Sequence, residues 1–168
     1  LFGTPERVQR ALGASHATQI GDRLVQIMKP DIKTLIRKPW TGLSLLGDVL
    51  SLPPKKVRKG KCQRQTLPLD ITKLPIPKTW PMDGGRYITL PLVVTRNPKT
   101  KEHNLGMYRA QIHGPKEVGL HWQIHKHGAE HAEAYPDGKM PVAICIGGPP
   151  ELIFSAIAPL PDNLEEYM

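Results

Sequence analysis

Hydrophobic and polar side chains alternate along residues 118–124, and this pattern predicts a β-strand with one apolar and one polar face. The apolar face would carry Val118, Leu120, Trp122 and Ile124, and the polar face His121, Gln123 and His125. Residues 104–112 are expected to form a second strand, and Gly114 with Pro115 provides a tight turn between the two. The resulting hairpin would bring Arg109 close to the strand that bears the histidines.

The first third of the chain shows helical periodicity. A helix is expected to begin at Thr4, whose hydroxyl can cap free N–H groups, and to end at Gly13. Residues 17–28 and 40–52 carry apolar side chains at helical spacing, and a short helix is expected over 31–37. These segments predict a helical N-terminal region.

The middle of the chain changes character. Recurrent prolines predict that residues 55–83 are extended or looped and do not form a central strand. A strand interrupted by Pro91 is expected over 87–95, with a turn at 97–99. Together with the two strands above, it suggests an antiparallel meander.

Three further elements are expected downstream. Residues 130–135 favour a short helix, residues 142–146 a buried strand, and residues 151–158 another helix. The glycines that precede the last helix favour an ordinary strand-to-helix joint over a phosphate cradle. Helical and antiparallel regions in separate parts of the chain predict an α+β fold.

Composition narrows the class of protein. Of the 168 residues, 39% are hydrophobic, which is enough for a core, and no run approaches the roughly 20 apolar residues that span a bilayer, so a cytoplasmic protein is expected. Cys62 and Cys145 lack the spacing of a zinc site or a disulfide framework. The net charge of +8 favours an anionic partner. Much of the excess lies in residues 55–64, however, where the absence of interleaved aromatics favours a solvated surface over a nucleic-acid interface.

Several segments together resemble one enzyme family. The motifs are NLGMYR at 104–109, HWQIHK at 121–126 and GAEH at 128–131, and residues 1–13, 91–98, 140–150 and 158–167 fit the same family in the same order. This pattern resembles the UbiD-type decarboxylases, which use prenylated FMN. The resemblance implies a split β-barrel, flavin-reductase-like domain over residues 55–168, preceded by part of an N-terminal helical region, 1–54. Because UbiD-type proteins are much longer, an interior piece without the C-terminal domain is expected.

The resemblance also implies a reaction and its partners. The reaction would be the reversible, non-oxidative decarboxylation of an aromatic or α,β-unsaturated acid, with prenylated FMN, Mn²⁺ or Mg²⁺, and K⁺ as a further candidate ion. A UbiX-like flavin prenyltransferase would supply the cofactor, and the full-length protein would be a homo-oligomer, peripherally bound to membranes if its substrate is a quinone precursor. The partner carboxylates of the family lie beyond Met168, so this chain alone is expected to be inactive. A non-catalytic flavin-binding fragment and, less favoured, a basic nucleic-acid binder are the alternatives.

The resemblance assigns the site residues by position. Arg109 is the candidate catalytic residue, since its planar fork can hold a carboxylate or a phosphate. Asn104 and Glu166 match the positions that hold the metal, and both offer hard oxygen donors. The cofactor contacts would be Met107, Tyr108, Arg109, His121, Trp122, Gln123, Lys126 and His127.

The roles of Trp122 and His121 remain open, and a zinc site is disfavoured. Core packing is as plausible for Trp122 as stacking on a flavin. Some relatives carry a metal-binding histidine where this chain has Leu120, which leaves the role of His121 unassigned. A zinc site built from His121 with His125 and from His127 with His131 would require a helix at 121–131, against the alternation that predicts a strand.

Overall fold

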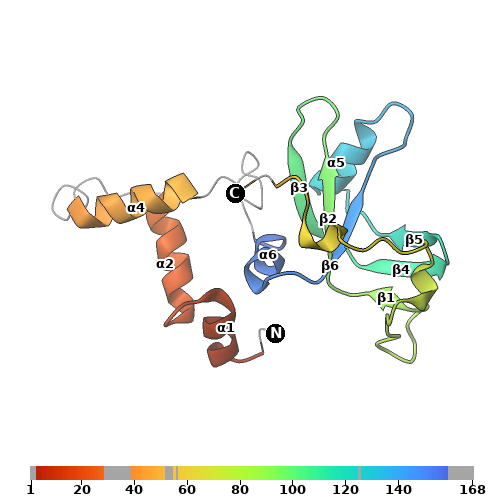
Figure 1. Cartoon of the computed structure of the whole chain (residues 1–168), viewed down its shortest axis with the longest axis horizontal. Helices are drawn as coiled ribbons and strands as arrows, with labels where there is room; N and C mark the ends of the chain where they lie inside the picture. Colours follow the sequence, from red (N-terminus) through yellow and green to blue (C-terminus); the bar gives the residue numbers. More distant parts are fainter. Residues whose placement is uncertain (1–2, 29–38, 52–54, 56, 125, 159–168) are drawn as a thin grey trace. The chain divides into compact units, whose positions relative to one another are not determined.

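The computed structural model describes residues 3–28, 39–51, 55, 57–124 and 126–158. The chain divides into two compact units, a helical one that contains residues 3–51 and a second one over Lys56–Glu166 (Figure 1). No helix within these described ranges is long and apolar enough to cross a membrane. Cys62 and Cys145 are both free and exposed.

The helical unit follows the sequence closely. Helix α1 spans Pro5–Leu12, with the Thr4 hydroxyl accepting the Arg7 N–H at 3.3 Å and Gly13 ending it at a φ of 63°, a left-handed conformation that glycine adopts without strain. Helix α2 spans Ala17–Met28 and α4 spans Pro39–Ser51. These three predictions are confirmed, whereas the short helix expected over 31–37 lies outside the described residues.

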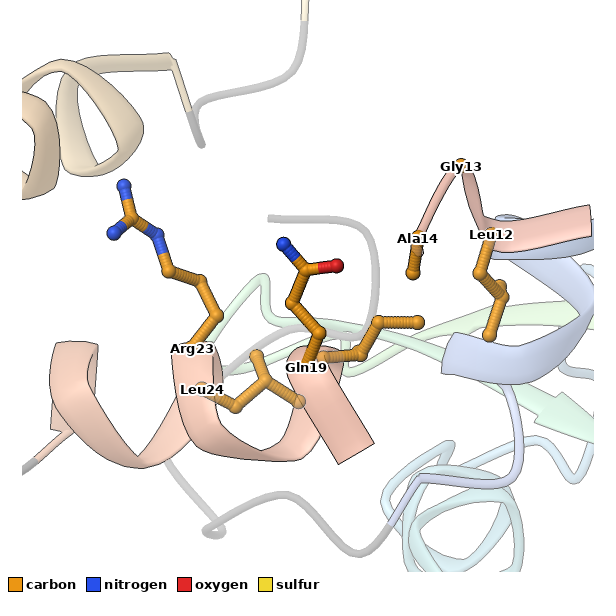
Figure 2. A pocket seen from close by; sticks show the side chains of 7 residues that line it. Leu12, Gly13, Ala14, Gln19, Arg23 and Leu24 are labelled. Carbon is orange, nitrogen blue, oxygen red and sulfur yellow. The ribbon is translucent and has the colours of Figure 1, made fainter. Parts of the chain in front are cut away.

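The loop between α1 and α2 borders an open hollow of about 430 Å³ (Figure 2). It is lined by Leu12, Gly13, Ala14, Gln19, Ile20, Arg23 and Leu24. None of the predicted site residues is among these lining residues. The apolar face predicted for α4 is largely exposed where it is described, at Leu43, Leu46 and Leu50.

Two three-stranded antiparallel sheets build the second unit (Figure 1). One has the order β1-β4-β5, with β1 at Tyr87–Ile88, β4 at Ala110–Gly114 and β5 at Glu117–Leu120. The other has the order β3-β2-β6, with β2 at Pro91–Arg96, β3 at His103–Met107 and β6 at Ala143–Ile146. Two short helices complete the unit, α5 at His127–Glu133 and α6 at Pro150–Ser155. The predicted α+β class is confirmed.

The antiparallel pairing of the predicted meander is confirmed, since 87–95 pairs with 104–112 and 104–112 pairs with the strand that begins at 117, but two breaks divide these pairs between two sheets. The segment 87–95 breaks at Thr89 and Leu90, so that β1 and β2 belong to different sheets. The segment 104–112, expected as one strand, likewise breaks at Tyr108 and Arg109 between β3 and β4. Period-two patterning reports which face a residue occupies but not where the chain passes from one sheet to another.

Two strand predictions also need correction. The strand expected over 118–124 ends at Leu120, and Ile124 is 82% exposed, because the chain turns there before α5. The strand over 143–146 exists, but it pairs only with β2 at the edge of its sheet and is mostly exposed rather than buried. The hairpin turn at Pro115 is confirmed, with Ala110 opposite Leu120.

The proline-rich segment is anchored by one side chain. It contains short 3₁₀ turns at Lys61–Gln63 and Ile71–Lys73 and is otherwise irregular, as predicted. Arg86 donates from Nε to the Ile76 carbonyl at 2.7 Å, from Nη1 to Thr72 at 2.9 Å and from Nη2 to Leu74 at 2.5 Å. Ile76 packs with Ile88 and Ala110 in the core of the first sheet. The clamp therefore satisfies carbonyls that no strand partner reaches.

Candidate functional site

The centre of the signature lies where the chain passes from β3 to β4. Tyr108 and Arg109 occupy this crossing, and they differ sharply in environment. Tyr108 is 9% exposed, whereas the side chain of Arg109 is 43% exposed. The crossing therefore buries an aromatic ring on one side and presents a cation on the other.

Tyr108 packs against protein. Its ring meets that of Trp122 edge-on, with centroids 4.7 Å apart and planes at 66°. Glycines make room for both rings: a Cβ on Gly106 would lie 2.3 Å from the Tyr108 ring, and one on Gly128 would lie 2.5 Å from Trp122. These contacts favour the packing alternative for Trp122 over stacking on a flavin.

Arg109 is held from two directions. Its Nη2 donates to Asp83 Oδ2 at 2.7 Å, and its Cζ lies 3.7 Å from the centre of the Tyr87 ring. The β1–β4 register explains the second contact, since Tyr87 pairs with Gln111 and is therefore the diagonal neighbour of Arg109. Sequence reasoning missed Asp83, which lies far from Arg109 along the chain in a turn without periodicity.

The Asp83–Arg109 pair changes the titration of both groups. The hydrogen bond from Arg109 lowers the pKa of Asp83, opposed by desolvation and helped by the Thr79 hydroxyl. The same bond raises the pKa of Arg109, which stays charged throughout. Because the folded pKa of Asp83 is depressed, the pair contributes stability above the ordinary aspartate pKa and loses it only as the pH falls through the lowered value.

Asn104 belongs to a buried polar chain that joins three elements. Its Nδ2 donates to Thr95 Oγ1 at 3.4 Å, and Thr95 Oγ1 lies 2.9 Å from His131 Nδ1. Thr95, Asn104 and His131 are 1%, 4% and 5% exposed. The Nδ2 end of the Asn104 amide faces Thr95, so the carbonyl oxygen is the end turned away from that hydroxyl.

Replacing Thr95 with valine is expected to lower the free energy of unfolding by about 2 kcal/mol, because two buried polar groups lose a hydroxyl partner at nearly constant volume. Serine should recover more than half of the loss, since it keeps the hydroxyl. Urea unfolding of the three proteins followed by circular dichroism measures the difference. Equal stability of the valine and serine variants would show that the hydrogen bonds contribute nothing.

The remaining predicted contacts lie around the loop that follows β5. His121, Gln123 and Lys126 are exposed, while Met107 and His127 are half-buried at the end of β3 and the start of α5. Glu166 and His125 lie outside the described residues. The structure thus places Tyr108 and Arg109 at the β3–β4 crossing and Asn104 near the other end of β3, and it does not describe the approach of Glu166 to Asn104.

The donor chemistry suits an anionic, aromatic ligand. Arg109 offers a planar fork and Lys126 a point charge, which are the groups that bind phosphates and carboxylates. For a metal, Asn104 supplies one hard carbonyl oxygen turned away from its own network. No group of three histidine, cysteine, aspartate or glutamate residues among the described positions could hold an ion. A metal therefore needs further oxygen donors beside Asn104.

Comparison with known proteins identifies the family of this chain. Residues 55–168 match the profile of the family described as UbiD, the 3-octaprenyl-4-hydroxybenzoate carboxy-lyase Rift-related domain. Uncharacterized proteins of Archaeoglobus fulgidus and Aquifex aeolicus are 41% and 42% identical to the chain and cover 99% and 100% of it. The chain spans 35% of the length of each. It belongs to the UbiD family.

Solved structures agree with this assignment. Vanillic acid decarboxylase from Sedimentibacter hydroxybenzoicus, in open form, is 28% identical with a TM-score of 0.59, covering 69% of this chain and 26% of its own. The UbiD-class enzyme HmfF from Pelotomaculum thermopropionicum, in complex with FMN, is 26% identical with a TM-score of 0.55, covering 58% and 22%. The closed form of the vanillic acid decarboxylase covers 98% and 34% at a TM-score of 0.73 and 24% identity, which shows the fold alone.

Proposed function

We propose that this chain is the prenylated-FMN-binding portion of a carboxy-lyase that reversibly decarboxylates an aromatic or α,β-unsaturated acid without net oxidation. The observation that carries the proposal is the presentation of Arg109 at the β3–β4 crossing, where it is charged, partly exposed and braced by Asp83 and Tyr87. A guanidinium fixed in this way recognises a planar carboxylate or a phosphate by direction as well as by charge. The structures of related UbiD-class enzymes with FMN and with prenylated FMN support the choice of ligand.

Each site residue has a proposed task. Arg109 orients the substrate carboxylate or the adjacent flavin, and Lys126 neutralises cofactor phosphate. His121 and Gln123 donate hydrogen bonds to the edges of the flavin, with Met107, Tyr108, Trp122 and His127 forming the surrounding wall. Asn104 and Glu166 bind Mn²⁺ or Mg²⁺, with K⁺ as a further candidate ion. When bound, the prenylated flavin supplies an acceptor for the electron pair that CO₂ leaves behind.

The proposed partners follow from the same assignment. A UbiX-like flavin prenyltransferase supplies the cofactor. The vanillic acid decarboxylase among the relatives supports an aromatic acid as the substrate class. An evolved form of HmfF is described as dimeric, which supports a homo-oligomer for the complete protein.

Co-expression of the 168-residue chain with a flavin prenyltransferase tests the proposal. We expect the purified chain to show the absorbance of a bound flavin and, by mass spectrometry, the mass of prenylated FMN. Arg109→Ala should reduce the flavin content at least about 10-fold, since a charge-assisted contact is lost. Arg96→Ala is the matched control, because Arg96 is another exposed arginine of the same unit that contacts a backbone carbonyl of its own hairpin.

Three results would contradict the proposal. A chain that carries no flavin lacks the proposed ligand. A chain that instead binds nucleic acid with an affinity that falls steeply with salt belongs to the alternative class of basic binders. A flavin content that Arg109→Ala and Arg96→Ala lower equally would remove Arg109 from the site. Because the chain spans 35% of the length of its relatives, we expect it alone to release CO₂ only at the background rate.

A further inference from the structure

We propose that Asp83 is the positioning residue for Arg109, which it holds in the one orientation that meets an anionic ligand. The inference rests on the proposed function for the identity of that ligand. Asp83 lies in the turn before β1, outside every motif that carries the family resemblance. The contacts that support this role are those of Asp83 within its turn, of Asp83 with Arg109, and of Arg109 with Tyr87.

Asp83 is itself fixed. Its side chain is 16% exposed, and Oδ2 accepts hydrogen bonds from the Thr79 hydroxyl at 3.1 Å and from Arg109 Nη2 at 2.7 Å. Its backbone N–H donates to the Trp80 carbonyl at 3.0 Å, which closes the turn. A carboxylate held within a closed turn can impose an orientation on a long, flexible cation, whereas a mobile surface acid would follow the cation.

Tyr87 supplies the complementary constraint. The Arg109 Cζ lies 3.7 Å from the centre of this ring, so the ring limits tilt of the guanidinium but leaves it free to rotate about the ring normal. The hydrogen bond to Asp83 removes that rotation. Together the two contacts determine where Nε and Nη1, which carry the remaining donors of the fork, are aimed.

Asp83 could position Arg109 or mask its charge, and the two roles predict opposite changes in affinity for an anion when Asp83 is replaced. A positioning carboxylate increases affinity for an anion, because Arg109 is already ordered before the ligand binds and loses less conformational entropy on binding. A masking carboxylate decreases that affinity, because it cancels the charge and occupies a donor. The number of contacts that immobilise Asp83 favours positioning.

Titration of the 168-residue chain with FMN as the probe, followed by flavin fluorescence, distinguishes these roles. Asp83→Asn is expected to raise the dissociation constant for FMN about 5- to 10-fold, as for neighbouring residues that act together. In an Arg109→Ala background the same substitution should have no further effect. Glu133→Gln is the matched control, since it removes one exposed carboxylate of the same unit, and it should leave the dissociation constant unchanged.

The outcomes separate this inference from the proposed function. Tighter FMN binding by Asp83→Asn, or an effect that persists without Arg109, would overturn positioning. If the wild-type chain does not bind FMN, the proposed ligand is wrong, and the ¹⁵N resonance of Arg109 Nε still tests Asp83 without any ligand. If Asp83 positions Arg109, the Nε–H signal should have a chemical shift distinct from that of free arginine and should exchange slowly with water. Asp83→Asn should move the signal toward the free-arginine shift. A signal that Asp83→Asn leaves unaltered overturns the inference.

Discussion

Under the proposed function, replacing Arg109 with lysine is expected to lower kcat/KM for decarboxylation about 10²- to 10³-fold in a protein of the relatives' length that contains this chain, although the charge is retained. Lysine offers a point charge on a flexible stem, so it loses both the directed hydrogen bond to Asp83 and the contact of the planar guanidinium with the Tyr87 ring. The loss should fall on kcat and on flavin affinity together, because the residue orients the ligand rather than merely attracting it. Steady-state CO₂ release and flavin titration of the same preparation measure the two quantities.

Arg96→Lys provides the reference for a general arginine-to-lysine effect, and it should change neither quantity by more than about 2-fold. An Arg109→Lys enzyme with wild-type kcat/KM would show that charge alone suffices. That result would remove the fork from the proposed mechanism and leave only electrostatic attraction.

Replacing Gly106 with alanine is expected to destabilise the chain by about 3 kcal/mol or more. The added Cβ would meet the Tyr108 ring at 2.3–2.7 Å, and that ring has little room to move because Trp122 packs against it. Gly114→Ala, whose Cβ would have its nearest neighbour at 3.9 Å, is the matched control and should be near neutral. Urea unfolding followed by circular dichroism measures both.

Removing the Tyr108 ring should remove the clash of the added Cβ at position 106. In a Tyr108→Ala background, Gly106→Ala should cost little further stability, because the ring that it strikes is absent. Equal costs of Gly106→Ala with and without Tyr108 would mean that strand geometry, rather than the ring, requires glycine at this position.

The helices and turns could be predicted because their determinants are local. The Thr4 cap, the Gly13 stop and the proline-rich irregular segment each depend on residues a few positions apart, and the structure reproduces them. Strand partners depend on distant segments. Pro91 marks the interruption beside Thr89, but nothing near Tyr108 indicates that the chain changes sheets there, so the antiparallel pairing could be predicted and its division between two sheets could not.

Some residues of the candidate site could likewise be predicted from the sequence, and others could not. Arg109 and Asn104 could be selected from their motif, whereas the groups that orient them, Asp83 and Thr95, could not. Thr95 lies directly opposite Asn104 in the β2–β3 ladder, so the strand register is the signal that would have found it. Asp83 has no such signal, because it reaches Arg109 from a turn.

The hydrogen bonds of Arg86 mean that a substitution there can affect Arg109 from a distance. By holding the Ile76 carbonyl, Arg86 ties together the ends of a loop that carries Thr79 and Asp83. A substitution at Arg86 would remove three hydrogen bonds that hold the base of that loop, and so loosen the support that Asp83 gives Arg109 without touching Arg109 itself. A variant of Arg86 that loses the proposed function would therefore not identify Arg86 as a ligand-binding residue.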